Sequence, residues 1–148
     1  MDELSTISTS IQYIVVKLGE ERFGINISYV DNIVRMQRMT RVPEVASYIK
    51  GVINLRGEVV PVMSTRIKMG LEPDVETSAT RIIILKFEQQ GYIGFIVDAV
   101  NEVVTLNADT IEKVADSNKD DAFVQGVGKS EDGLISILNL NALIDEQI

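Results

Sequence analysis

Carboxylates are the abundant side chains of this sequence that could take part in chemistry, with 22 aspartates and glutamates in 148 residues. Adjacent pairs stand at Glu20–Glu21 and Asp120–Asp121, and the second pair ends an acidic cluster at 116–121. A glycosidase or a metal site needs carboxylates that converge from separate elements, whereas neighbouring acids in polar turns are normally solvated. The cluster also lacks the glycine and the terminal glutamate of a calcium-binding loop. We therefore expect no catalytic and no metal site here.

Nucleophilic chemistry lacks its usual partners, because the chain contains no histidine and no cysteine. Ser64 has no imidazole to activate it, and neither thiolate chemistry nor a disulfide framework is available. Gly126 and Gly128 are not followed by the third glycine of a dinucleotide fingerprint. The sequence predicts a protein that is not an enzyme and uses no cofactor.

Arg56 is the side chain best suited to recognition. It lies in a polar insert, Asn54–Glu58, between two apolar runs that read as strands joined by a tight turn. The planar guanidinium supports several contacts at once, so arginine is enriched at binding hot spots. An isolated loop arginine is, however, more often simply solvated. Upstream, Pro43 biases Val42 towards an extended backbone.

An apolar stripe offers a second candidate surface. Ile27, Val30 and Ile33 follow one another at intervals of three, which places them along one side of a helical turn that runs into a strand. They either cover the core or line a groove to which a later segment contributes Val97 and Val100. Such a groove could hold an amphipathic partner helix by its apolar face.

The elements that must position these residues occur twice. Gly24 and Gly94 are 70 residues apart, as are Val30 and Val100, whereas Gly51 and Gly126 are 75 apart. The difference indicates about five residues gained in the polar connection 107–122. The second copy has acidic and small residues where the first has Arg56. This asymmetry argues against a purely structural role for the arginine turn.

Within each copy, short β-branched runs alternate with turn signals at the spacing of all-β folds. We expect two five-stranded β-barrels packed together, with an open β-sandwich as the alternative. The expected divisions are a flexible N-terminus at 1–12, a first barrel at 13–79 and a second at 80–148. Short helical turns are expected at Ser28–Asn32 (capped by Ser28), Asp109–Val114, Ser64–Gly70 and Leu140–Glu146.

Composition limits the partners. The net charge of -8 argues against nucleic acid and against a bare anionic membrane, because both are bound mainly through lysine and arginine. No apolar segment approaches the ~20 residues of a membrane span, and the N-terminus does not resemble a signal peptide. We expect a cytoplasmic protein.

From 13 to 144 the sequence resembles the CheW-type chemotaxis coupling proteins. The specific part is Val42–Pro43 followed by Tyr48–Gly57 (YIKGVINLRG) and Val59–Val62. The resemblance implies two five-stranded SH3-like barrels in a non-catalytic adaptor. It also implies two partners, a CheA-type histidine kinase bound through its regulatory domain and methyl-accepting chemotaxis receptors bound at their helical tips. The chain would be recruited to receptor arrays without being embedded in the membrane.

The resemblance also implies site residues. The kinase-binding surface would comprise Val42, Pro43, Asn54 and Arg56, and the receptor groove would comprise Ile27, Val30, Ile33, Val97 and Val100.

The chain departs from the family pattern in three places. Asn32 replaces an acidic residue that could pair with the arginine, so the partner of Arg56 should be Asp31, Glu58 or a kinase residue. Met63–Thr65 replaces the usual Ile-Asp-Leu. The absence of a receiver domain before Ile148 favours a stand-alone coupler over a CheV-type fusion. The alternatives are a regulatory module of a larger signalling protein and a small carboxylate or metal-binding protein.

Overall fold

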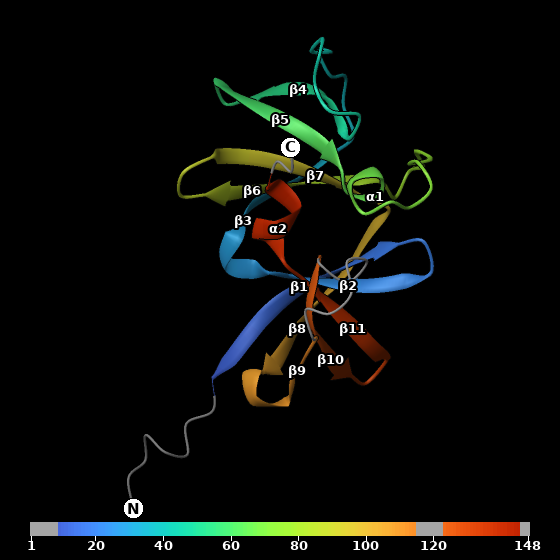
Figure 1. Cartoon of the computed structure of the whole chain (residues 1–148), viewed down its shortest axis with the longest axis vertical. Helices are drawn as coiled ribbons and strands as arrows, with labels where there is room; N and C mark the ends of the chain where they lie inside the picture. Colours follow the sequence, from blue (N-terminus) through green and yellow to red (C-terminus); the bar gives the residue numbers. More distant parts are fainter. Residues whose placement is uncertain (1–8, 115–122, 146–148) are drawn as a thin grey trace, which may run out of the picture.

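The computed structural model describes residues 9–114 and 123–145, which form two β-sheets, one in each half of Figure 1. The acidic cluster at 116–121 lies outside these residues. The upper sheet has the order β3-β6-β7-β5-β4, and the lower sheet has the order β8-β1-β2-β11-β10-β9. We call them the upper and the lower barrel.

The upper barrel consists of β3 (Val30–Arg35), β4 (Ile49–Leu55), β5 (Glu58–Ser64), β6 (Arg81–Phe87) and β7 (Gly91–Val97). The lower barrel consists of β1 (Ser10–Leu18), β2 (Glu21–Asn26), β8 (Ala99–Asn107), β9 (Glu112–Lys113), β10 (Val124–Ser130) and β11 (Gly133–Leu138). Five strands in each barrel match the expected all-β fold. The two-residue strand β9 is an addition at the edge of the lower one.

The two copies of the repeat exchange their first hairpins. β1 and β2 pair with β8 and β11 of the second copy, while β6 and β7 pair with β3 and β5 of the first. The orders β8-β1-β2-β11-β10 and β3-β6-β7-β5-β4 correspond strand by strand under the repeat offsets. The barrels therefore do not follow the expected boundary between 79 and 80. Each is built from two separate stretches of chain.

Four short helical segments occur among the described residues: η2 (Ile27–Tyr29), α1 (Thr65–Lys68), η3 (Ala108–Thr110) and, after the last described strand, α2 (Leu140–Ile144). All four fall near the expected turns. The cap of η2 is Asn26 and not Ser28, because the Asn26 side chain accepts a hydrogen bond from the Ser28 N–H. Among the described residues, none of these helices has the length and apolar character needed to cross a bilayer.

Each barrel has its own core, and a third core joins them. The inner clusters are Ile53, Val60, Val62, Ile82, Ile84 and Ile96 in the upper barrel, and Tyr13, Val15, Leu106, Ile135 and Ile137 in the lower. The shared core takes the opposite faces of both sheets, with Phe23, Phe95, Leu85 and Leu143 among its buried members. Burial on both faces explains why β1 and β6 are continuous apolar runs.

Glycine is needed where strands approach closely. A β-carbon on Gly94 would lie 2.7 Å from the Ile82 side chain, and one on Gly51 would lie 2.7 Å from the Thr40 carbonyl oxygen. Thr40 forms an isolated antiparallel bridge with Val52 at this point. The glycine at 51 therefore lets the segment after β3 close onto β4, which is the edge strand of the upper barrel.

Candidate interaction surfaces

The polar insert forms the expected tight turn between β4 and β5. Arg56 and Gly57 both have positive φ, at 51° and 85°, as a two-residue type I′ hairpin turn requires. The Asn54 side chain accepts a hydrogen bond from the Gly57 N–H at 3.1 Å, which holds the turn from inside. Left-handed backbone is uncommon for an arginine and is often found at functional sites.

Asp31 is the partner of Arg56. The Arg56 guanidinium donates to the Asp31 carboxylate at 2.7 Å, and the two side chains are 65% and 25% exposed. Together with Leu55, Glu58, Val60 and Tyr92 they line a hollow of about 300 Å³. The ion pair thus bridges β3 and the β4–β5 turn, and the replacement at Asn32 leaves Arg56 paired.

A bulge in β3 decides which side chain meets the arginine. Val30 pairs with Leu85 and Asn32 pairs with Ile84, so Asp31 is the extra residue. Directly opposed side chains share a face of the sheet. Because Ile33 then pairs with Ile83, Val30 and Ile33 both lie on the shared-core face. The bulge therefore preserves the predicted stripe, since a regular strand would place residues three apart on opposite faces.

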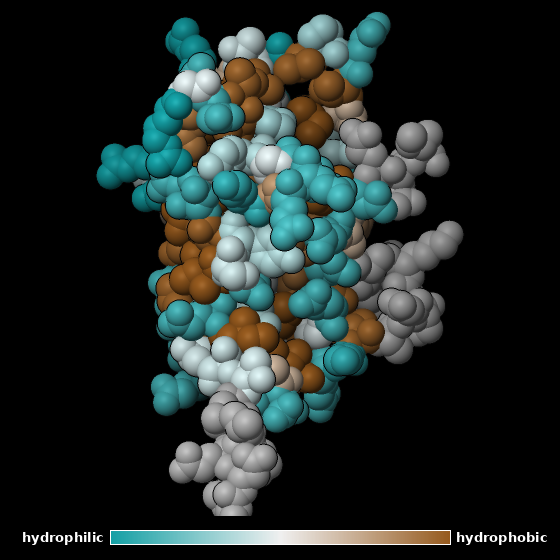
Figure 2. Space-filling view, turned by 90° about the vertical axis from the view of Figure 1, so that its left-hand side faces the viewer, coloured by the Kyte–Doolittle hydropathy of each residue, from teal (hydrophilic) through white to brown (hydrophobic). Residues whose placement is uncertain are grey.

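The five residues of the expected receptor groove surround the two crossovers between the barrels. Ile27, Val30 and Val100 are half-buried against the shared core, and Ile33 is 36% exposed. Val97 is fully buried in that core, so it can support a groove from beneath but offers no surface. On the side where β3 lies in Figure 1, apolar side chains form separate patches among polar ones (Figure 2).

The four residues of the expected kinase surface lie at two ends of β4. Asn54 and Arg56 are at its C-terminal end. Val42 lines an apolar hollow of about 540 Å³ with Tyr48 and Ile49, at the other end, and exposed Pro43 adjoins it. A seven-residue strand spans about 20 Å, so these residues form the two ends of one strip and no single patch.

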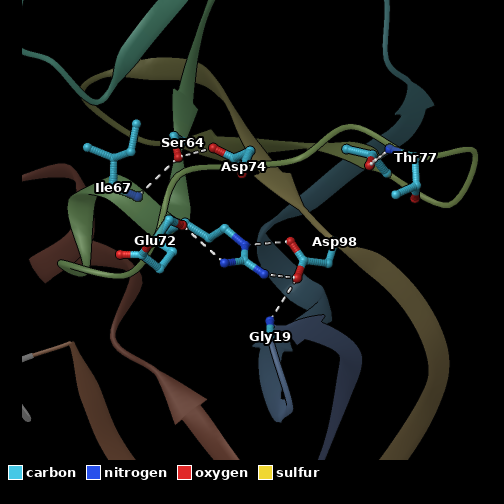
Figure 3. Close-up of polar contacts among 9 residues, drawn as sticks. Gly19, Ser64, Ile67, Glu72, Asp74, Thr77 and Asp98 are labelled. Atoms are coloured by element: carbon cyan, nitrogen blue, oxygen red, sulfur yellow. Dashed lines mark hydrogen bonds and ion pairs between the residues drawn. The ribbon is translucent and has the colours of Figure 1, made fainter.

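Arg66 and Asp98 tie the upper barrel to the lower one, a contact the sequence did not predict. Arg66 on α1 donates to both Asp98 oxygens, at 2.8 and 2.5 Å, and to the Glu72 carbonyl oxygen at 3.0 Å. Asp98 also accepts the N–H of Gly19, in the β1–β2 turn, at 2.7 Å (Figure 3). The Arg66 hydrogen bonds lower the pKa of Asp98, against the opposing effect of burial. The same hydrogen bonds raise the pKa of Arg66.

Ser64 has a structural role. Its side chain is fully buried, accepts the N–H of Ile67 at 3.1 Å and donates to Asp74 (Figure 3). It is the N-cap of α1. Met63 is buried in the shared core, so the Met63–Thr65 replacement is accommodated without loss of the cap.

Within the part of the chain that the structure describes, no group of three or more acidic side chains could hold a metal ion. What the described surface does offer is an arginine turn, apolar crossovers and the strip along the edge strand β4. Two SH3-like barrels that share a core and present such surfaces define a binding scaffold.

Comparison with known proteins identifies the family. Residues 12–147 match the CheW-like domain. The chain is 36% identical to the chemotaxis protein CheW of Bacillus subtilis, over 95% of this chain and 91% of that protein. It is 33% identical to the chemotaxis protein CheW of Helicobacter pylori, over 90% and 81%. The crystal structure of the scaffolding protein TtCheW from Thermoanaerobacter tengcongensis superposes with a TM-score of 0.86 at 34% identity, covering 94% and 95% of the two chains.

The chain belongs to the CheW-like family and is a chemotaxis coupling adaptor. The all-β fold of two SH3-like barrels is confirmed by the sheet topology and by this neighbour.

Proposed function

We propose that this chain links the tips of methyl-accepting chemotaxis receptors to a CheA-type histidine kinase in the cytoplasm, by binding alone. The β4 strip of Val42, Pro43, Asn54 and Arg56 docks the regulatory domain of the kinase. The crossover residues Ile27, Val30, Ile33 and Val100, supported by Val97, hold a receptor helix. A rearrangement of the receptor then changes the position of the kinase.

The observation that carries the proposal is the conformation of Arg56. An arginine occupies a left-handed position that glycine, asparagine or aspartate would fill with less strain. Its side chain is 65% exposed while Asp31 holds the guanidinium in place. A long cation fixed at a tip and directed to solvent is suited to a partner. In the other copy, the corresponding residue is Glu131.

Replacement of Arg56 tests the kinase surface. Arg56→Ala keeps a β-carbon, so the backbone preference at this position changes little. Because an exposed ion pair contributes only about 0–1 kcal/mol, the melting temperature should hardly change. The affinity for the kinase regulatory domain, measured by isothermal titration calorimetry, should fall severalfold.

Asp31→Asn is the matched variant, since it removes the ion pair but keeps the arginine. We expect a smaller loss of affinity than for Arg56→Ala. Unchanged kinase binding by Arg56→Ala would remove this residue from the interface.

A further inference from the structure

The charge of the chain is strongly divided along the sequence. Residues 32–57 contain five basic side chains and one acidic, whereas the rest of the chain contains nine basic and 21 acidic. The local net charge is therefore +4 in a protein whose remainder carries -12. Four of the basic residues, Arg35, Arg38, Arg41 and Lys50, are exposed, and we call them the cationic band.

The band follows the segment after β3, which closes onto β4, the edge strand of the upper barrel. Thr40 bridges Val52 of β4 in antiparallel fashion, with backbone hydrogen bonds of 2.9 and 2.8 Å in the two directions. This direction brings Arg41 towards Lys50, and both line one hollow of about 700 Å³. It also runs Arg38 towards the Arg56 end of the strand. Arg38, Arg41 and Lys50 thus lie along β4 between the two ends of the β4 strip, and Arg35 precedes them at the end of β3.

The band carries a local electrostatic cost. Arg35 lies directly opposite Arg81 in the pairing of β3 with β6, and like charges at opposed positions destabilise a sheet. Arg81 turns its guanidinium to the carbonyl oxygens of Ser78 and Thr80, at 2.8 and 2.9 Å. Within the described residues, the ion pairs involve Arg22, Arg56 and Arg66, and none involves the band.

Four exposed cations without ion-pair partners in the described chain favour an anionic ligand. A membrane or a nucleic acid would also meet the surrounding -12 of the chain, which repels an extended anionic surface. A protein face of limited size avoids that repulsion. We propose that the cationic band binds an acidic protein surface, namely a carboxylate-bearing face of the kinase domain that docks along β4.

This inference rests on the proposed function and adds the charge of the partner. Complementary exposed charges mainly raise the association rate, and salt screens them within about 10 Å at 0.1 M ionic strength. The band should therefore accelerate docking, while the apolar hollow at Val42 and the arginine turn determine how long the complex lasts.

The test is a charge reversal with a matched control. Arg35→Glu/Arg38→Glu inverts two band residues that lie outside the β4 strip. Lys113→Glu/Lys129→Glu makes the same change in net charge at the corresponding edge of the lower barrel, where both lysines are exposed. Association and dissociation rates with the kinase regulatory domain are measured by stopped-flow fluorescence at about 50 mM and about 500 mM salt.

We expect the band variant to associate roughly tenfold more slowly than wild type at low salt, with a dissociation rate within about twofold. The difference should vanish at high salt, and the lysine control should behave as wild type. If both variants associate equally slowly, the effect comes from net charge alone. If neither variant associates more slowly than wild type, the band takes no part in association. Either result overturns the inference.

A second measurement separates this inference from the proposed function. A glutamate-rich peptide is titrated into the isotope-labelled chain and followed by nuclear magnetic resonance. Shifts confined to the band, and absent in Arg35→Glu/Arg38→Glu, support the acidic partner even if the kinase domain does not bind. Band-dependent binding to phosphatidylserine vesicles, without a response to the peptide, would instead assign the band to membrane and overturn the inference.

Discussion

Arg56 and Arg66 each bind one aspartate, yet the two ion pairs have different consequences because their exposure differs. The Arg56 side chain is 65% exposed, and its pair with Asp31 uses one hydrogen bond. The Arg66 side chain is 17% exposed, and it binds both oxygens of Asp98. Paired hydrogen bonds with partial burial are the stronger arrangement. This difference supports the proposed binding role of Arg56 and leads us to expect that Arg66 stabilises the fold.

Asp98→Asn should lower the free energy of unfolding by about 1–2 kcal/mol at pH 7. Hydrogen bonding to Arg66 lowers the pKa of Asp98 in the folded state, whereas an unfolded aspartate has a pKa of about 3.9. The stabilisation is thus complete above the unfolded pKa and is lost as the pH falls through the folded one. Thermal unfolding is measured from pH 7 to pH 2. The difference in melting temperature between wild type and variant should decrease below about pH 4.

Asp132→Asn, in the exposed β10–β11 turn, is the control and should stay within about 0.5 kcal/mol of wild type. If the difference in melting temperature between wild type and Asp98→Asn stays constant down to pH 2, the stability does not come from the ionised Asp98 carboxylate.

At the scale of elements, the bulge in β3 has a counterpart in β8. The pairing of β8 with β1 shifts register at Val100 and Glu102 in the same way that β3 shifts at Val30 and Asn32. Ile33 and Val103 are consequently related by the repeat, and they are 36% and 51% exposed. Only Ile33 belongs to the expected receptor groove, which makes the pair a natural comparison.

Ile33→Asp should abolish receptor capture in a pull-down with receptor signalling domains, because it places a charge in an apolar contact. Val103→Asp should leave capture unchanged. Both sites are exposed, so the circular dichroism spectrum should stay β-rich in each variant. Ile33 serves better than half-buried Val30, whose replacement by aspartate would also disturb the shared core.

Equal receptor capture by wild type and Ile33→Asp would remove β3 from the groove. Loss of capture in both variants would instead show a general effect of added charge.

The hairpins were predictable from the sequence, but their assembly was not. Turn residues such as Gly19 and Gly57 act locally, so the β1–β2 and β4–β5 hairpins follow from short windows. The exchange of β1–β2 and β6–β7 between barrels depends on non-local pairing. The two copies have the same apolar patterns, so each hairpin could pair with the strands of either copy. The expected boundary at 79/80 assumed that each barrel forms from consecutive strands.

The candidate sites show the same limit. The prominence of Arg56 could be seen in the sequence, and Asp31 was one of three partners considered. Only the bulge selects Asp31, and a bulge leaves no clear mark in the apolar pattern. Val97 reads as a groove residue by its spacing, although two-sided burial places it in the core. The Arg66–Asp98 contact joins residues 32 positions apart, and no motif indicates it.

At the scale of the whole molecule, the pseudo-symmetric halves are used differently. Arg66 and Asp98 close one junction between the barrels. Asn141 and Ser28, their repeat counterparts, line an open hollow of about 550 Å³. Among the described residues, the arginine turn and the cationic band also occur on the upper barrel alone. A scaffold with two unlike faces can hold two unlike partners at once, which is what a coupling protein must do.

Kinase activity in a reconstituted mixture tests this central claim most directly. Receptor signalling domains and the CheA-type kinase are combined with or without this chain, and the rate of kinase autophosphorylation is measured. We predict that the receptor changes this rate only when the chain is present, and that Arg56→Ala or Ile33→Asp weakens the effect. A kinase that responds equally without the chain, or a chain that binds only one of the two partners, would contradict the account.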